Sequence, residues 1–167
     1  MEDAIFTRVS IRKFTDGAVT KEDIERLMRA AMAAPSAGNQ QPWEFFVTRD
    51  VDLKLKLSET SPYAKPAAGA DVVIVPCLKQ GEMRFPEYGA IDLSACTENI
   101  LLEAAAMGLG AVWLGVYPEQ DRIDAVADCL GNPDGLTPFA LIALGHPAEE
   151  VSPRSAKRYE PDRIHWV

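Results

Sequence analysis

The pattern of apolar and polar positions along the chain predicts helices interleaved with a few buried strands. Residues 20–34 form the clearest amphipathic helix, because apolar residues recur there at helical spacing and Thr20 with Asp23 resembles a capping box. Runs rich in branched or aromatic apolar residues are expected to be strands at residues 43–48, 71–77, 111–116 and 139–144. The other periodic segments are expected to be helices at residues 2–7, 51–59, 89–107 and 119–130.

This order of elements predicts the α+β class, as an α/β sandwich whose sheet is covered on both faces. With 167 residues, the chain is expected to form a single domain, residues 1–167. From residue 148 onward the periodic pattern stops and prolines, charges and aromatic residues follow. A free tail seldom ends in residues such as Tyr159 and Trp166. Residues 148–167 are therefore expected to form an extended C-terminal arm that packs on its own domain or on a partner subunit.

The net charge of −8 argues against a protein that mainly binds DNA or RNA, because phosphate neutralisation by Lys and Arg supplies much of that affinity. Basic residues nevertheless gather near the two ends of the chain, whereas the stretch between residues 79 and 134 is strongly acidic. An acidic protein with small basic clusters can still bind a compact anion such as phosphate. On composition alone, scattered solvated charge is the favoured alternative.

The three cysteines, Cys77, Cys96 and Cys129, are widely spaced and odd in number, which argues against a disulfide scaffold or a CxxC pair. Each lies in an apolar stretch, so we expect all three to be core residues. The lack of a disulfide pattern indicates a reducing compartment, which we expect to be the cytoplasm. The sequence shows no apolar signal segment and no apolar run long enough to cross a bilayer, so no membrane association is expected. The two histidines have no close cysteine or histidine partner, and no metal site is expected.

The segment RVSIR, residues 8–12, contains the first candidate chemistry. In an extended segment alternate residues share a face, so Arg8, Ser10 and Arg12 would point together. Two guanidinium groups and a hydroxyl can clamp a phosphate, since Arg binds phosphate oxygens in bidentate fashion. The alternative interpretation is an exposed edge whose charges are simply solvated.

Two further segments can bring backbone close to a flat ligand. Residues 34–43 (APSAGNQQPW) combine small residues, which allow close approach, with Asn39 and Gln41, which can donate and accept hydrogen bonds. Residues 110–115 (GAVWLG) form a strand that ends at a glycine, and ligands often sit beyond strand ends. The respective alternatives are an ordinary polar loop and a core strand. The sequence contains no GxGxxG, P-loop or GxSxG motif, which excludes those nucleotide clamps and that nucleophile elbow.

Taken in order, five segments make the chain resemble the nitroreductase family of FMN-dependent flavoproteins. They are RVSIRKF (8–14), APSAGNQQPWEF (34–45), DLSACTENILLEAAAMGLGAVWLG (92–115), ALGHP (143–147) and RYEPDRIHW (158–166). The resemblance implies a mixed sheet flanked by helices, in an intertwined homodimer whose C-terminal arms cross to the partner subunit. It also implies two FMN molecules at the subunit interface. Longer family members carry a helical insertion over the flavin that this chain lacks.

The cofactor site that this resemblance implies is divided between the two subunits. Contacts to the FMN phosphate and the flavin edge are expected from Arg8, Val9, Ser10 and Arg12, and a second phosphate contact from Arg158. The residues expected to reach from the other subunit and line the flavin ring are Pro35, Ser36, Ala37 and Asn39. The residues expected near the flavin N5 edge are Leu114 and Gly115. No side chain is expected to act as a catalytic acid or base.

The implied activity is that of an FMN-dependent oxidoreductase. NADH or NADPH would deliver hydride to flavin N5 and then make way for a nitro compound, a quinone or a similar small organic acceptor. Exchange of the two substrates at one site predicts ping-pong kinetics. Other reactions on the same flavin fold, such as dehalogenation or enone reduction, stay open, as do a ferredoxin donor and a non-catalytic FMN-binding module.

Overall fold

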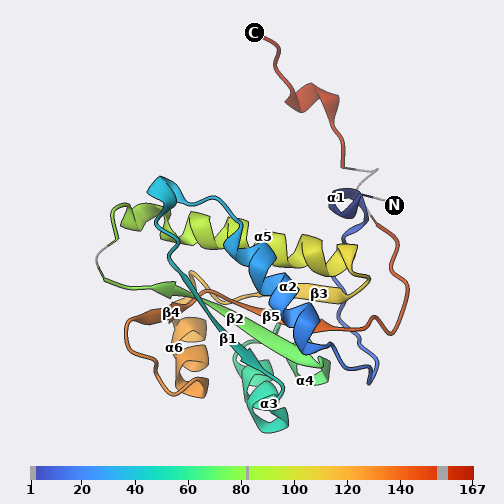
Figure 1. The fold of residues 1–167 in the computed structure, drawn as a ribbon, viewed down its shortest axis with the longest axis vertical. Coiled ribbons are helices and arrows are strands. Elements are labelled where there is room, and N and C mark those ends of the chain that lie inside the picture. Colours follow the sequence, from blue (N-terminus) through green and yellow to red (C-terminus); the bar gives the residue numbers. More distant parts are fainter. Residues whose placement is uncertain (1–2, 82, 154–157) are drawn as a thin grey trace.

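The computed structural model describes residues 3–81, 83–153 and 158–167 (Figure 1). The helices are α1 (Ala4–Thr7), α2 (Lys21–Met32), α3 (Val51–Glu59), α4 (Pro66–Gly69), α5 (Gly89–Ala106) and α6 (Gln120–Cys129). The strands are β1 (Trp43–Thr48), β2 (Val72–Lys79), β3 (Gly110–Gly115), β4 (Leu136–Pro138) and β5 (Ala140–Gly145). Short 3-10 turns are η1 (Ala37–Asn39), η2 (Pro86–Tyr88) and η4 (Pro161–Arg163).

The strands form one sheet in the order β1-β2-β5-β3, with β4 pairing alongside β2. Every pairing between these strands is antiparallel. Among the described residues, the one parallel pairing is a bridge between Ser10 and Ala111, which places the N-terminal segment against the outer edge of β3. The predicted sheet flanked by helices is confirmed, and the bridge brings the RVSIR segment beside the strand that ends at Gly115.

Helices cover both faces of the sheet. Successive strand residues point to opposite faces, and here both sets are apolar, so both faces need a covering layer. Along β2, Val72 and Ile74 pack into the layer formed with α2 and α5, whereas Val73 and Val75 pack into the layer formed with α3, α4 and α6. Figure 1 shows α2 and α5 on one side of the sheet and α3, α4 and α6 on the other. The strands are apolar at nearly every position because each face of the sheet packs against its own hydrophobic core.

The start of α2 is fixed by the capping box that the sequence predicted. Thr20 Oγ1 accepts a hydrogen bond from Asp23 N at 3.0 Å, and Asp23 Oδ2 accepts one from Thr20 N at 3.0 Å. These bonds satisfy two backbone donors that a helix start would otherwise leave unpaired. The helix ends at Met32, two residues short of the expected end, since Pro35 follows closely.

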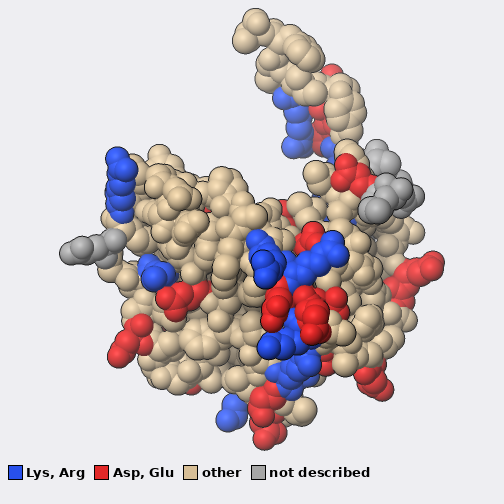
Figure 2. All heavy atoms as spheres, in the orientation of Figure 1, with Lys and Arg blue, Asp and Glu red and all other residues tan. Residues whose placement is uncertain are grey.

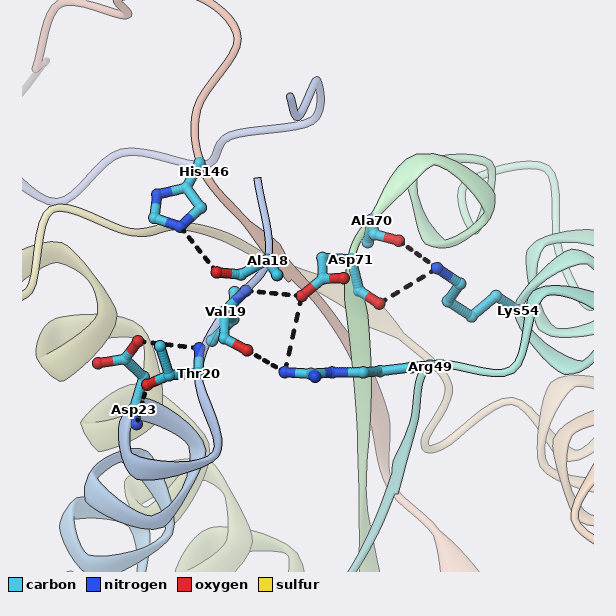
Figure 3. A network of polar contacts seen from close by, with 9 residues as sticks. All are labelled: Ala18, Val19, Thr20, Asp23, Arg49, Lys54, Ala70, Asp71 and His146. Atoms are coloured by element: carbon cyan, nitrogen blue, oxygen red, sulfur yellow. Dashed lines mark hydrogen bonds and ion pairs between the residues drawn. The ribbon is translucent and has the colours of Figure 1, made fainter. Parts of the chain in front are cut away.

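A second polar network ties the segment before α2 to the start of β2 (Figure 3). Asp71 Oδ2 accepts a hydrogen bond from Val19 N at 2.8 Å and lies 3.8 Å from Arg49 Nη2, which also donates to Val19 O. Lys54 is buried, and its Nζ donates to Ala70 O at 2.6 Å and Asp71 O at 3.1 Å. Because each charge here is hydrogen-bonded, we interpret this network as structural support for the fold.

The C-terminal arm extends away from the folded body (Figure 1). All of its described residues from 158 to 167 are exposed, and Trp166 retains 92% of its accessible surface. The described part of the arm therefore does not bury its aromatic side chains against its own domain. The start of the arm contacts its own domain, since Ala148 N donates to Lys13 O at 3.0 Å and Glu149 pairs with Lys13. Packing of the arm on a partner subunit and the single-domain assignment stay predictions.

Candidate functional site

A cavity of about 520 Å³ lies between the N-terminal segment and the start of the arm. The predicted phosphate-binding residues line it together: Arg8, Val9, Ser10, Arg12 and Arg158. The space-filling view shows the arm standing off the body, with an open concavity between them (Figure 2). Three arginines and two hydroxyl-bearing residues, Ser10 and Tyr159, therefore line one space from segments almost 150 residues apart in the sequence, and no acidic residue belongs to the described lining.

Arg8 and Ser10 are held by different elements. Arg8 directly follows α1, and its Nε lies 3.4 Å from Glu98 Oε1 of α5. Its two Nη groups make no hydrogen bond within the described residues and are thus left for a ligand. Ser10 is fixed through its backbone by the bridge to Ala111. Arg12 is exposed, and its Nη1 donates a long hydrogen bond of 3.4 Å to Ser10 O.

Gly110 allows the N-terminal segment to approach β3 this closely. A Cβ atom at Gly110 would lie 2.7 Å from Ile11 Cγ2, which is closer than real Cβ contacts come. The Ile11 N–H also donates to Ala111 O at 3.0 Å. Since Ile11 is buried, the alternation of an extended chain turns its neighbours Ser10 and Arg12 outward toward the cavity.

The loop that carries Pro35, Ser36, Ala37 and Asn39 has an unusual backbone. Gly38, Asn39 and Gln41 all adopt positive φ values, 56°, 55° and 46°. Ser36 Oγ accepts a hydrogen bond from Gln41 N at 3.0 Å, which closes the loop on itself. The Asn39 side chain is exposed and makes no hydrogen bond within the described residues, so it is available to a ligand.

The protomer does not bring this loop to the basic cavity. The loop is attached to Asp92 near the start of α5, whereas Arg8 contacts Glu98 further along the same helix. A separation of six residues on an α-helix corresponds to about 9 Å along the axis and about 240° around it. None of the predicted loop residues belongs to the described lining of the cavity. Within one protomer the two halves of the predicted site are therefore separate, and their union across a subunit interface stays a prediction.

Leu114 and Gly115 lie at the end of β3, outside the described cavity lining. The whole Leu114 residue is 4% exposed and packs in the core layer with α6. Its predicted place near the flavin N5 edge stays a prediction. Gly115 is exposed, and its carbonyl oxygen accepts a hydrogen bond from Arg122 Nη1 at 3.2 Å.

Sequence reasoning missed several residues around these two regions. The cavity is also lined by Ile5, Phe6, Val151 and Tyr159. Asp92 and Phe85 anchor the loop. The sequence offered a signal for Asp92 alone, as an isolated acidic residue in the first turn of a largely apolar helix. Tyr159 stood out in the sequence only as an aromatic residue of the tail, and Ile5, Phe6 and Val151 carried no signal, because only the fold brings the two chain ends together.

Cys77 and Cys96 are buried core residues, as the sequence indicated, whereas Cys129 is only partly buried. Burial raises the pKa of Cys77 and Cys96 from 9.0 to about 12, and the charge of Glu44 adds to the effect at Cys77. Cys129 is partly buried and its pKa is also raised, chiefly by burial. A thiol that stays protonated is a poor nucleophile, so these residues are not candidates for covalent catalysis.

We expect Cys77 and Cys96 to resist iodoacetamide in the native protein at pH 8 and to react fully in denaturant. Because their folded pKa values lie above the unfolded value, the stability they contribute is complete below pH 9 and is lost as pH rises toward 12. Mass spectrometry of alkylated peptides measures this. Equal labelling of Cys77 with and without denaturant would contradict the buried positions.

The described residues contain neither a candidate metal site nor a membrane-spanning helix. Within residues 3–81, 83–153 and 158–167, no three His, Cys, Asp or Glu side chains lie close enough to hold a metal ion. His146 directly follows β5, and its Nε2 lies 3.3 Å from Ala18 O (Figure 3). No helix among the described residues has the length and apolarity needed to span a membrane.

Comparison with known proteins gives one consistent result. A model of the nitroreductase family matches residues 5–68 and 61–146. A candidate NADH dehydrogenase/NAD(P)H nitroreductase from Archaeoglobus fulgidus is 44% identical over 163 residues, covering 96% of this chain and 94% of the relative. The crystal structure of a candidate NADH oxidase from Clostridium acetobutylicum has 43% identity and a TM-score of 0.92, with 98% of each chain covered.

A third relative carries a ligand in its structure. It is a candidate nitroreductase from Desulfovibrio desulfuricans in complex with FMN, with 34% identity, a TM-score of 0.76 and 94% of each chain covered. The matches to these relatives extend over nearly the whole chain, and the family model covers most of it. The chain belongs to the nitroreductase family.

Proposed function

We propose that this chain binds FMN in the basic cavity and works as an NAD(P)H-dependent oxidoreductase that reduces a small organic acceptor. Membership of the nitroreductase family supports the reaction class, and the FMN complex of the Desulfovibrio desulfuricans relative supports the cofactor. The names NADH dehydrogenase and NAD(P)H nitroreductase of the Archaeoglobus fulgidus relative support a nicotinamide donor.

The lining of the cavity is the observation that carries this proposal. Arg8, Arg12 and Arg158 bring three permanently charged groups to one space, and Ser10 adds a hydroxyl. A phosphate monoester carries about 1.5 to 2 negative charges at neutral pH and offers three acceptor oxygens. Guanidinium groups match those oxygens in charge and geometry. The residues present therefore fit the phosphate end of FMN.

FMN, when bound, supplies the redox chemistry by accepting hydride at N5 and passing electrons to an acceptor. The chain's own residues hold the phosphate, present the small residues of the 35–39 loop, and offer exposed backbone at Gly115. No side chain is assigned a role as acid or base. Donor and acceptor would use one site in turn, which gives ping-pong kinetics.

A homodimer would complete this site. One protomer would contribute the basic cavity, and its partner the 35–39 loop, which each protomer holds away from its own cavity. Apolar side chains near the loop, Tyr88 and Ile91, are 45% and 61% exposed and would be covered by the partner. We also propose a cytoplasmic location, in keeping with the free cysteines.

The visible absorption spectrum of the purified protein tests the proposed function. We expect a flavin band that bleaches on anaerobic addition of NADH or NADPH and returns with a quinone or nitro compound. Initial rates measured with both substrates varied should give parallel double-reciprocal lines. A colourless protein that takes up no added FMN would overturn the cofactor assignment.

The spectrum also separates the proposed enzyme from a different class of protein. A flavin band that persists after both nicotinamides would favour a non-catalytic FMN-binding module or a ferredoxin donor. A substrate panel containing halogenated aromatics and enones distinguishes nitro or quinone reduction from the other reactions that the fold supports.

A further inference from the structure

We propose that Asp92 and Gln40 act as positioning residues that hold the 35–39 loop in the shape needed to contact FMN in the partner's cavity. This inference rests on the proposed function, because it assigns a role toward the cofactor. It concerns residues that do not line the basic cavity and that the site assignment above leaves without a role.

Asp92 binds the loop through both carboxylate oxygens. Its Oδ1 accepts a hydrogen bond from the Ala37 backbone N–H at 2.9 Å, and its Oδ2 accepts one from Gln40 Nε2 at 2.7 Å. Both donors flank Gly38 and Asn39, the two residues at the tip of the loop. A single carboxylate thus fixes the loop on each side of its tip.

The carboxylate is buried, with 5% of its residue surface exposed, which makes these hydrogen bonds obligatory. No Lys or Arg within the described ranges forms a salt bridge with Asp92. Its charge is compensated instead by the two loop donors and by its place in the first turn of α5, where the helix dipole favours negative charge. Any loop shape that withdrew those donors would leave a buried charge unsatisfied.

Gln40 extends the attachment to a third segment. Its Nε2 also donates to Phe85 O at 3.0 Å, and its Oε1 accepts from Phe85 N at 3.1 Å. The Phe85 ring in turn covers Gly38, where a Cβ atom would lie 2.6 Å from Phe85 Cε2. The loop is therefore fixed by α5 beneath it and by the segment before η2 beside it.

The backbone of the loop shows why such an anchor is needed. Asn39 and Gln41 adopt positive φ, which L-residues with side chains rarely do and which costs free energy. Residues held in such conformations cluster at ligand-binding sites and persist only where their surroundings enforce them. Here the hydrogen bonds of Asp92 and Gln40 hold the loop in this conformation. As a result, the tip of the loop presents Asn39 to solvent.

Asp92→Asn tests this role directly, because it preserves volume but places an amide donor against the Gln40 amide donor. We expect FMN to bind about tenfold or more weakly to this variant. Should Asp92→Asn fail to fold, Gln40→Ala at a half-buried position serves as the second variant.

Asp71→Asn is the matched control. Asp71 also accepts an N–H from a distant segment, but it lies in the structural network of Figure 3, away from the loop. The Asp71→Asn variant should lower the melting temperature of the apoprotein without changing the FMN dissociation constant. If Asp92→Asn lowers the melting temperature similarly and leaves FMN affinity unchanged, Asp92 is merely structural and the proposal is overturned.

Mixed dimers test whether the loop acts on the partner. Chains carrying Asp92→Asn and chains carrying Arg12→Ala, isolated as heterodimers with two different tags, should form one intact site and one doubly impaired site. We expect about one tightly bound FMN per dimer, against none for either homodimer at the same concentration. Two equally weakened sites would overturn action across the interface. Wild-type protein that binds no FMN would instead refute the proposed function itself.

Discussion

Replacing Arg8 and Arg12 together by alanine is expected to lower FMN affinity about 100-fold or more. Each hydrogen bond to a charged group contributes about 1.5–3 kcal/mol, so losing two costs about 3–6 kcal/mol. Both arginines line the cavity, and of the described lining only Arg158 would remain to neutralise the phosphate. Titration of apoprotein with FMN, followed by flavin fluorescence, measures the dissociation constant.

Lys13→Ala is the matched control for this double variant. Lys13 adjoins Arg12 in sequence and carries the same charge, but it pairs with Glu149 at 3.1 Å and does not belong to the described cavity lining. It should bind FMN as the wild type does. Riboflavin, which lacks the phosphate, should bind equally to wild type and double variant. Equal loss of FMN affinity in Lys13→Ala would show a general charge effect rather than a phosphate clamp.

Hydrophobic periodicity predicted most of the fold because the long elements are also the buried ones. The branched apolar run of β2 and the 18-residue length of α5 each indicate the element, because a short continuous apolar run favours a buried strand and a long one a buried helix. The helix α4 and the strand β4, with four and three residues, are too short to show any period. Their formation depends on neighbours instead, since β4 exists by pairing with the end of β2.

The candidate site was predictable where its chemistry is local. Arg8, Ser10 and Arg12 reach one cavity because an extended segment repeats every two residues, which the sequence reveals directly. The role of Asp92 was not predictable, since its partners lie 52 and 55 residues away and only folding brings them together. Leu114 was placed near the flavin N5 edge by resemblance alone, and that contact stays a prediction, while its burial in the core follows from its place in an apolar strand.

Shortening the chain after Arg158, so that Tyr159–Val167 are removed, is expected to convert the proposed dimer into monomers. The removed stretch includes Tyr159, Ile164 and Trp166, which are 72%, 45% and 92% exposed in the protomer. Burying an apolar side chain contributes about 1.5–3 kcal/mol, so three such residues would supply about 4–9 kcal/mol to association. Sedimentation equilibrium should show a dimer dissociation constant raised by about 1,000-fold or more.

Arg158→Ala in the full-length chain separates association from phosphate binding. This variant keeps the apolar arm but loses one cavity charge, so it should stay dimeric while binding FMN more weakly. The shortened chain keeps Arg158 but should lose FMN as well, because a lone protomer holds its 35–39 loop on Asp92, away from its own cavity. A shortened chain that remains dimeric would show that the arm is dispensable for association. A shortened monomer that binds FMN with unchanged affinity would show that the basic cavity is sufficient without the partner's loop.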